Sequence, residues 1–440
     1  MMRTNAIVVV CCIFMVQISG SYSIRNHNSV FNAIDAQPSP RNKRDGSKLA
    51  LASFRMKFPK IPKFDIDSLK NGLRRRAVTL SPATVKATAA LVTIMGLFSI
   101  VMNKVLWTPS RKYSQESNSV AQEYDAWERE GILEYYWGEH IHLGYYEDSV
   151  QRQRIPFLPP KKNFIQAKFD FIDEMLRFGQ FPTDSLAVEA ASMKVNSLEE
   201  STAESPAGSE IRKPSVLKIL DVGCGIGGTS RYLAKLLGDG ALVTGITLSP
   251  NQARRASELA ATQGVTNTEF KVMDALKMDF PDNSFDFVWA CESGEHMPDK
   301  KKYVEEMTRV LKPGGRIVIA TWCQREEGSV PFTKKERRML DFLYSEWTHP
   351  YFISIEEYKR LLEGTGLLQD VVTDNWSRQT IPSWLHSIWV GVFDPMPVLR
   401  QPKLWWKCFR DGLTLVRMHS SFRDGLMQYG MMTAQKTKPM

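Results

Sequence analysis

An acidic residue followed by closely spaced glycines is the pattern in this 440-residue chain that points most directly to chemistry. Asp221 precedes Gly223, Gly225 and Gly227 in the run "LDVGCGIGG". Glycine has no Cβ, so the backbone at these positions can approach a ligand closely. An acid just before them attracts an amino or cationic group and repels a pyrophosphate. The pattern therefore favours S-adenosylmethionine (SAM), which carries an α-amino group and a sulfonium, over a dinucleotide.

The same glycines also fit a second template, because Gly223, Gly225 and Gly228 spell the G-x-G-x-x-G of dinucleotide sites. Such sites usually place an acid at the end of the next strand for the ribose hydroxyls. Thr247 stands there in "ALVTGITLSP", and the missing acid counts strongly against an NAD-dependent dehydrogenase and mildly against SAM, whose sites usually carry the same acid. Asp274 follows a third strand and can accept a hydrogen bond from the adenine amino group. The expected cofactor residues are Asp221, Gly223, Gly225, Gly227, Thr247, Asp274 and Ala275.

A second unusual stretch is "YYWGEHIHLGYY", residues 135–146, with five aromatic residues and two histidines. It fits a packed core, the mouth of an apolar pocket or a metal site. The H-x-H spacing of His140 and His142 permits a metal, but no third ligand is evident nearby and the six cysteines form no CxxC pair. We therefore predict no metal site.

The surrounding segments predict the elements that must position these residues. From Val216 onward, buried strands alternate with amphipathic helices, as in a doubly wound α/β fold. Pro313 and Gly314 are expected to end a helix over 300–315, and residues 161–179 read as a helical hairpin. The globular domain is expected at 115–435. It has a disordered insertion at 185–213 and a helical, tryptophan-rich insertion at 377–426 that either covers a substrate pocket or packs as core.

The basic character of the chain belongs to its N-terminal region. Residues 1–112 hold 18 Lys and Arg against 4 Asp and Glu, and the remainder holds 39 against 44. This distribution argues against nucleic acid as a partner and favours targeting or attraction to a membrane surface. Residues 1–23 read as a signal peptide, residues 24–85 as a transit-like basic segment and residues 87–107 as a transmembrane anchor. We expect a plastid membrane, either envelope or thylakoid, of a secondary plastid reached through the secretory route.

Several motifs in combination resemble the class I methyltransferases that act on tocopherols and related prenylquinols. They are "LDVGCGIGG", "VTGITLSP", "ESGEHMPDK" and "LKPGGRIVIATW". The stretches "SVAQEYDAWEREGILEYYWGEHIHLGYY", "SEWTHPYFISIEEYKRLLEGTGL" and "IPSWLHSIW" are similar to the cyanobacterial-type 2-methyl-6-phytyl-1,4-benzoquinol methyltransferases. The resemblance covers residues 87–435 and implies a Rossmann-like, seven-stranded sheet with one antiparallel strand.

The resemblance also implies an activity and a set of acting residues. A methyl group would pass from SAM to a ring carbon of a lipophilic prenylated benzoquinol, and this reaction needs a base beside the ring. Glu292 and His296, after the fourth strand, and His140 and His142 are the candidates. Glu292 serving only the cofactor and His296 as a structural histidine remain alternatives. Glu295 is expected to be solvated.

Residues 135–146 are then best interpreted as a pocket cover. Tyr136, Trp137 and Tyr145 can offer ring faces to the substrate or to the sulfonium, and the two histidines can reach the quinol oxygens. Core packing of the whole stretch remains the alternative.

The expected substrate is 2-methyl-6-phytyl- or 2-methyl-6-solanesyl-1,4-benzoquinol. The second candidate is a γ-tocopherol methyltransferase, which "ESGEHMPDK" resembles more closely, and the third is a sterol C-methyltransferase. A protein of the same fold without activity, serving as a scaffold, is disfavoured by the intact Asp221, Gly223, Gly225 and Asp274.

Overall fold

The computed structural model describes residues 81–111, 113–114, 119–152, 158–182, 216–328 and 330–438. The expected signal peptide, nearly all of the transit-like segment and the 185–213 insertion lie outside these residues. The chain divides into two compact units, Met1–Val101 and Met102–Met440. The larger unit contains the whole of the domain expected at 115–435.

Helix α3 (Pro82–Leu106) contains the expected anchor at 87–107 except its last residue. Its segment Val85–Leu106 is long and apolar enough to cross a membrane. The side chains from Val85 to Val101 are exposed. By length and composition, α3 is therefore a candidate membrane span.

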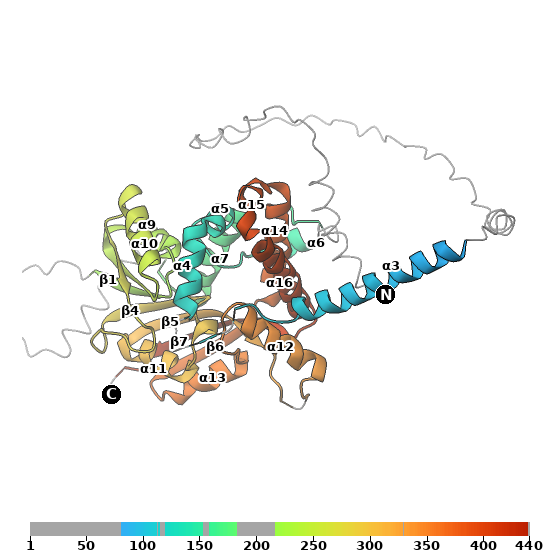
Figure 1. The fold of residues 1–440 in the computed structure, drawn as a ribbon. Coiled ribbons are helices and arrows are strands. Elements are labelled where there is room, and N and C mark those ends of the chain that lie inside the picture. Colours follow the sequence, from blue (N-terminus) through green and yellow to red (C-terminus); the bar gives the residue numbers. More distant parts are fainter. Residues whose placement is uncertain are drawn as a thin grey trace, which may run out of the picture. The chain divides into compact units, whose positions relative to one another are not determined.

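The larger unit is built on a seven-stranded sheet with the order β3-β2-β1-β4-β5-β7-β6 (Figure 1). All neighbouring strands pair in parallel except β7, which is antiparallel to both β5 and β6. This confirms the mixed sheet with one antiparallel strand. The strands are β1 (Leu217–Val222), β2 (Ala241–Thr247), β3 (Thr268–Val272), β4 (Phe285–Cys291), β5 (Leu311–Gln324), β6 (Leu368–Asn375) and β7 (Met427–Lys436).

Helices cover both faces of this sheet and are fixed at their starts by short polar side chains. Asn163, Ser249, Asp299, Thr333 and Ser354 accept hydrogen bonds from the first-turn N–H groups of α7, α10, α11, α12 and α13. The helices of the larger unit are α4 (Ser119–Glu130), α5 (Ile132–Trp137), α6 (Asp148–Arg152), α7 (Phe164–Gly179), α9 (Gly228–Leu237), α10 (Pro250–Thr262), α11 (Lys300–Val310), α12 (Lys334–Glu346), α13 (Ile355–Gly364), α14 (Ser377–Phe393), α15 (Met396–Leu399) and α16 (Trp405–Arg423).

Alternate residues of the central strands pack into two separate hydrophobic cores. Val318 and Met431 belong to a cluster with side chains of α7, α9, α14 and α16. Ile317 and Met432 belong to a second cluster, with side chains of α11 and α13. Because successive residues of a strand point to opposite faces, this division places one core on each side of the sheet.

Two expected elements differ from the structure. Helix α11 ends at Val310 rather than near Pro313, because Leu311 pairs with Phe285 and so begins β5. The register then shifts, and Gly314 adopts a positive φ within the irregular region. Of the expected hairpin at 161–179, residues 164–179 form one helix, α7, because the apolar side chains recur on a single face that is buried against the sheet.

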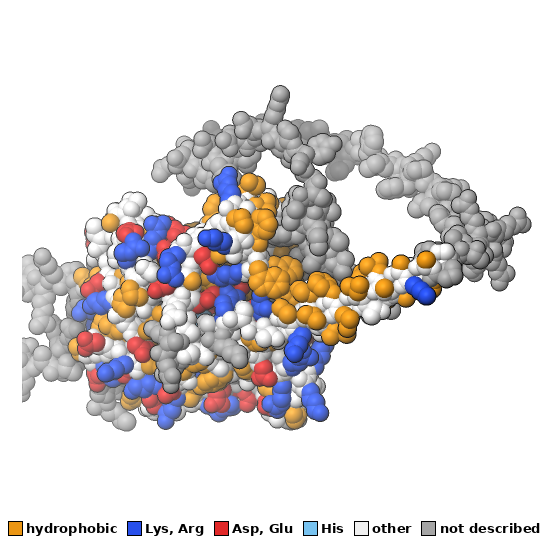
Figure 2. Space-filling view, in the orientation of Figure 1, with side chains coloured by type: hydrophobic (Ala, Val, Ile, Leu, Met, Phe, Trp, Pro, Cys, Tyr) orange, Lys and Arg blue, Asp and Glu red, His pale blue; other side chains and the backbone are white. Residues whose placement is uncertain are grey.

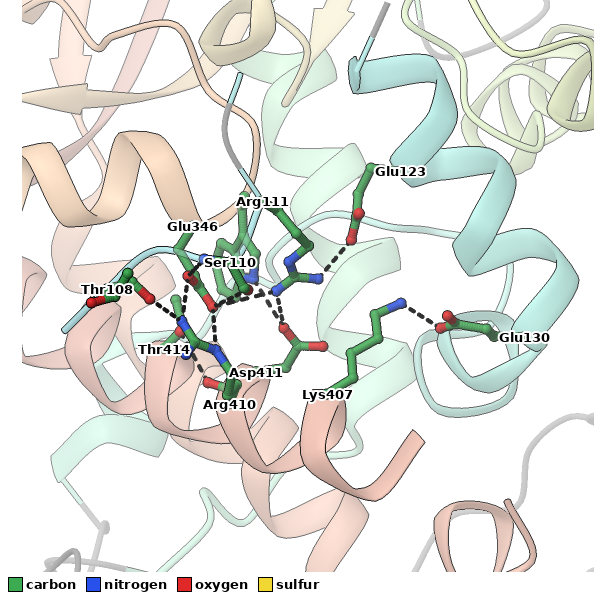
Figure 3. A network of polar contacts seen from close by, with 11 residues as sticks. Thr108, Ser110, Arg111, Glu123, Glu130, Glu346, Lys407, Arg410, Asp411 and Thr414 are labelled. Carbon is green, nitrogen blue, oxygen red and sulfur yellow. Dashed lines mark hydrogen bonds and ion pairs between the residues drawn. The ribbon is translucent and has the colours of Figure 1, made fainter. Parts of the chain in front are cut away.

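The segment after α3 is held on the larger unit by a buried ionic network (Figure 3). The Glu346 carboxylate accepts hydrogen bonds from the Ser110 backbone N–H at 2.9 Å and from the Arg410 guanidinium at 2.8 and 3.1 Å. Arg410 also donates to the Val105 and Thr108 carbonyls. The network joins residues 105–110 to α12 and α16, and so fixes the start of the segment that leads into α4.

Candidate active site

A cavity of about 400 Å³ opens at the carboxyl ends of the parallel strands. The strand order reverses between β1 and β4, and such a switch point is where open α/β sheets bind ligands. The walls come from the loops after β1, β2, β3 and β4, from α4, and from residues 139–142.

Six of the seven expected cofactor residues line this cavity: Asp221, Gly223, Gly225, Thr247, Asp274 and Ala275. Gly227 lies just outside the lining, where it precedes α9 with a φ of 75°. A Cβ on Gly225 would meet nothing within 4 Å, so this glycine leaves room on the cavity side of the loop. The arrangement fits a ligand that lies directly on the glycine turn.

Asp221 is the buried acid of this wall, with 2% of its surface exposed. Its Oδ2 accepts a hydrogen bond from the Ser230 hydroxyl at 2.6 Å. Burial raises the pKa of Asp221 to about 6, and the Ser230 hydrogen bond opposes that rise. A cationic group in the cavity would stabilise the charged carboxylate, which is the behaviour expected beside the amino group of SAM.

Gln252 is a lining residue that the sequence analysis missed. Its Oε1 accepts a hydrogen bond from the Thr247 hydroxyl at 2.8 Å, and the residue is 4% exposed. An amide beside Thr247 can serve the ribose hydroxyls where the usual acid is absent. The signal was available, since Ser249 and Pro250 begin a helix and place Gln252 in its first turn, next to the end of β2.

Glu292 lies directly after β4 and lines the cavity. Its Oε1 accepts hydrogen bonds from the Leu143 backbone N–H and from the Tyr429 hydroxyl, both at 2.8 Å. Burial, together with the nearby Glu295, raises the pKa of Glu292 above the ordinary carboxylate range. A carboxylate with a raised pKa is a stronger base, so Glu292 can both hold and release a proton near neutral pH.

The expectation for Glu295 was wrong, since this residue is only 1% exposed. Its Oε2 accepts a hydrogen bond from the Thr321 hydroxyl at 2.7 Å, and burial raises its pKa. Lys300 is also buried, and its ammonium group donates to the backbone carbonyls of Gly294, Glu295 and Met297. These carbonyls lie in and just after the η2 turn (Gly294–His296). The turn folds Glu295 inward against β5, which sequence spacing alone did not reveal.

His296 lines the cavity opposite a second missed residue, Tyr124 of α4. The Tyr124 hydroxyl and His296 Nε2 lie 2.9 Å apart, and the His296 ring stacks on His349 with centroids 4.5 Å apart. Burial lowers the pKa of His296 to about 3. His296 is therefore neutral at physiological pH and is a much weaker base than Glu292.

The stretch 135–146 closes over the glycine turn. A Cβ on Gly228 would lie 2.1 Å from the Glu139 carbonyl oxygen, so the two backbones are in direct contact. The Glu139 carboxylate forms an ion pair of 2.6 Å with Arg231, which is 1% exposed. This attachment explains why His140, Ile141 and His142 reach the cavity wall.

Both histidines of this stretch are buried and neutral. Burial lowers the pKa of His140 to about 3 and also lowers that of His142. His142 Nδ1 donates to the Leu143 carbonyl at 2.8 Å, which leaves Nε2 as the acceptor nitrogen. Among the described residues, neither His142 Nε2 nor His140 Nδ1 has a hydrogen-bond partner. Each therefore offers a hydrogen bond without carrying a charge.

Tyr136, Trp137 and Tyr145 are not in the lining of this cavity. The Tyr136 hydroxyl donates to the Asp394 carbonyl, the Trp137 ring packs edge-on against Phe164, and the Tyr145 ring packs against Trp376. Their contacts are with the protein, as in the alternative of core packing. Of this stretch, His140 and His142 reach the cavity and these three rings do not.

Among the described residues, no group of three or more His, Cys, Asp or Glu side chains is arranged to hold a metal ion. Cys224, Cys291, Cys323 and Cys408 are free thiols.

The sequence around this site is similar to that of known methyltransferases. The family model described as "Methyltransferase domain" matches residues 220–319. The 2-methyl-6-phytyl-1,4-hydroquinone methyltransferase of Synechocystis sp. is 41% identical over 322 residues, which cover 73% of this chain and 88% of that protein. The chloroplastic tocopherol O-methyltransferase of Arabidopsis thaliana is 37% identical over 322 residues, covering 70% and 80% of the two chains.

Solved structures agree with the fold at lower identity. Phosphoethanolamine N-methyltransferase 2 of Haemonchus contortus, in complex with SAM, matches with a TM-score of 0.51 at 18% identity, covering 72% of this chain and 60% of that chain. Geranyl diphosphate C-methyltransferase of Streptomyces coelicolor A3(2), in complex with S-adenosyl-L-homocysteine, matches with a TM-score of 0.50 at 18% identity, covering 74% and 100%.

Proposed function

Because the chain belongs to the SAM-dependent methyltransferases of the tocopherol and prenylquinol group, we propose that it methylates a ring carbon of 2-methyl-6-phytyl- or 2-methyl-6-solanesyl-1,4-benzoquinol. The observation that carries the proposal is Glu292, a buried carboxylate with a raised pKa in the wall of a cavity whose other side is the glycine turn. Cofactor site and base thus share one enclosed space, as methyl transfer to an aromatic carbon requires.

When bound on the glycine turn, SAM supplies an electrophilic methyl group. Asp221 would hold the amino-bearing end of the cofactor, Thr247 and Gln252 would bond its ribose, and Asp274 would accept from its adenine amino group, since all four line the cavity. Residues 139–142 close the turn from the outside and exclude water.

Glu292 acts on the quinol. Its carboxylate takes a proton from, or accepts a hydrogen bond from, a ring hydroxyl, which raises the electron density of the ring carbon. The carbon then forms its bond to the methyl group while the bond from sulfur to that methyl group breaks. Glu292 returns its proton to the ring oxygen where it had taken it, and the freed carboxylate accepts the proton that the methylated carbon gives up. The products are the methylated quinol, S-adenosylhomocysteine and one proton, which passes from Glu292 to solvent.

The histidines position the substrate rather than take its proton. His296, His140 and His142 are neutral, so each can hydrogen-bond a quinol oxygen without holding a charge in the cavity. Tyr124 orients the His296 ring through its hydroxyl. The helical insertion at 377–426, which contains α14 to α16, is the proposed cover for the prenyl tail. None of its residues, all of which the structure describes, lines the cavity, and Trp384, Met418 and Phe422 pack in the core.

The second candidate is the conversion of γ- to α-tocopherol, which also adds a methyl group to a ring carbon. The relative of Arabidopsis thaliana favours it at 37% identity. Full-length protein in detergent, supplied with isotopically labelled SAM and each substrate in turn, separates the two. A labelled dimethyl-phytyl-benzoquinol supports the leading proposal, labelled α-tocopherol supports the second, and label in neither contradicts both.

We also propose a plastid membrane as the location, with α3 as the anchor. Two of the relatives are named as chloroplastic, and the expected substrate carries a long apolar tail that would lie in lipid. The signal peptide at 1–23 and the transit-like segment at 24–85 would direct the chain to a secondary plastid. Fluorescent fusions of residues 1–85 in a cell with such a plastid test the targeting.

A further inference from the structure

The outer end of the helical insertion carries a cluster of exposed apolar side chains. We define the insertion tip as residues 393–407, from the end of α14 through α15 and the η3 turn (Pro402–Leu404) into α16. Phe393 is 69% exposed, Met396 47%, Trp405 43% and Trp406 49%. Figure 2 shows hydrophobic side chains gathered, with Lys or Arg beside them, over the region that Figure 1 labels α15. Elsewhere on the described part of the larger unit, large exposed apolar side chains are scattered.

The aromatic rings of the tip are suited to an apolar surrounding. Trp405 donates its indole N–H to the Val398 carbonyl at 3.0 Å, so its polar group is satisfied internally. Trp406 stacks on Phe409 with ring centroids 5.7 Å apart. Trp405 can therefore enter an apolar medium without leaving its N–H unpaired, and Trp406 presents a ring face that is already packed on one side.

Cations surround the tip. Arg129, Arg400 and Lys403 line one groove of about 480 Å³. Arg400 also lines an adjoining groove with Met396 and Asp394, whose carboxylate accepts a hydrogen bond from the Tyr135 hydroxyl at 2.6 Å. None of these three cations forms an ion pair with another described residue. The carboxylate in the first groove, Glu130, is already neutralised by Lys407 at 2.5 Å (Figure 3). The groove therefore presents uncompensated positive charge beside exposed tryptophans.

We propose that the insertion tip docks on the surface of an anionic lipid bilayer, with the tryptophans at the interface and a lipid phosphate in the groove of Arg129, Arg400 and Lys403. Tryptophan is enriched at membrane interfaces, and cations next to it bind anionic head groups. A stable protein interface buries roughly 1,600 Å² in total, far more than four side chains supply. This contact goes beyond the proposed methyl transfer and is separate from α3.

Photocrosslinking tests the contact without substrate or SAM. The full chain carrying photoreactive benzoylphenylalanine in place of Trp406 is reconstituted in vesicles of phosphatidylcholine and phosphatidylglycerol, with the phosphatidylcholine radiolabelled. We expect strong lipid labelling from position 406. The same probe in place of Leu236, which is 38% exposed on α9, should label lipid about tenfold less.

Charge reversal then tests the groove. Combining Arg400→Glu with Lys403→Glu should reduce labelling from position 406 about tenfold, since both attractions become repulsions. The matched control, Lys301→Glu with Lys302→Glu on α11, changes the net charge equally and should leave labelling unchanged. The thermal unfolding midpoint checks that both variants fold. If the tip variant does not fold, the protein without charge reversal gives the same test. Lipid labelling from position 406 is then compared between the mixed vesicles and vesicles of phosphatidylcholine alone, and it should be stronger in the mixed vesicles.

Three results would overturn the proposal. Equal labelling from positions 406 and 236 would mean that the tip has no preferred membrane contact. Equal labelling in mixed and uncharged vesicles would remove the phosphate site. Crosslinks between two chains in place of lipid would make a second copy the occupant of the tip.

Discussion

The Tyr429 hydroxyl donates a hydrogen bond of 2.8 Å to Glu292 Oε1, which joins the antiparallel strand β7 to the loop after β4. The same oxygen accepts from the Leu143 backbone N–H. Both donors stabilise the charged carboxylate and so oppose the rise in pKa caused by burial. Tyr429 and the 135–146 stretch thus each lower the pKa of Glu292, which lines the cavity.

This relationship predicts the pH dependence of methyl transfer. Glu292 must be deprotonated to act, and its pKa is raised, so activity should rise with pH through an acid limb well above the ordinary glutamate value of about 4.3. Glu292→Gln should lower kcat by about 10²- to 10⁴-fold. Tyr429→Phe removes a donor that lowers the pKa, so its limb should move to higher pH. Single-turnover rates against pH measure this, and a wild-type limb near 4.3 would remove Glu292 as the base.

A second prediction separates histidine from glutamate. The pKa of His296 is lowered to about 3, so its titration lies below the range in which activity is measured. His296→Gln should therefore reduce kcat without moving the acid limb. Tyr124→Phe, which keeps the ring but loses the 2.9 Å contact, should give a smaller loss of the same kind. A limb that disappears in His296→Gln would instead make the histidine the base.

A third prediction concerns SAM affinity. Burial raises the pKa of Asp221 to about 6, and a bound cation should lower it. SAM binding should therefore weaken as pH falls below about 6, and near that pH binding should release a proton. Calorimetry in two buffers of different ionisation enthalpy measures both effects.

Two variants sharpen this prediction. Asp221→Asn should bind SAM weakly and without the pH dependence. Ser230→Ala loses the 2.6 Å hydrogen bond that holds the pKa down, so its affinity should begin to fall at a higher pH. Unchanged affinity in Asp221→Asn would contradict the cofactor site.

A site residue could be predicted from the sequence when the residues that position it lie close to it in the chain. Asp221 and Gly225 act through a strand and a turn within seven residues, and local pattern is enough to find such units. Glu292 meets Tyr429 across 137 positions, a pairing set by strand order. Sequence spacing could place Glu292 after β4, but it could not bring the tyrosine from β7 to it.

The same reasoning explains the differences from expectation. Glu295 was expected in solvent because a charged residue in a polar loop usually is, but the η2 turn presses it against Thr321. Tyr136 and Trp137 share the aromatic stretch with His140, but they belong to helix α5, which ends at Trp137. Their side chains therefore pack against the protein, and of this stretch only residues 139–142, which follow the helix, line the cavity. A change of local conformation within twelve residues is not visible in composition.

A fourth prediction compares two glycines of the turn. Gly225 has a φ of 54° and open space where a Cβ would stand, so Gly225→Ala should cost about 1–2 kcal/mol of stability from strain. Its methyl group would also occupy the cofactor side of the loop and weaken SAM binding. Gly264→Ala, with a φ of 68° and open space away from the cavity, is the matched control and should keep full SAM affinity.

Gly228→Ala should behave differently, since its Cβ would lie 2.1 Å from the Glu139 carbonyl oxygen. The backbone of the 135–146 stretch would have to move, at a cost of about 1–3 kcal/mol. Limited proteolysis should then cut this stretch faster in Gly228→Ala than in Gly225→Ala. Equal cleavage in the two variants would contradict its role as a cover fixed on the turn.

A fifth prediction concerns the network that holds the segment after α3. Glu346 is completely buried and pairs with Arg410, whose side chain is 8% exposed, at 2.8 Å (Figure 3). Removal of one member leaves the other charged and buried, so Glu346→Ala or Arg410→Ala should each lower the free energy of unfolding by about 3–5 kcal/mol. The combined replacement Glu346→Leu with Arg410→Met removes both charges and should cost less than the sum of the two single changes.

Arg254 and Glu258 on α10 form an exposed pair at 2.5 Å, and breaking it should change stability by less than about 1 kcal/mol. Chemical unfolding of the full chain in detergent measures all four. Additive losses at Glu346 and Arg410 would show that the two side chains do not act as a pair, and that residues 105–110 are held on the larger unit by apolar contacts such as that of Trp107 with Phe342.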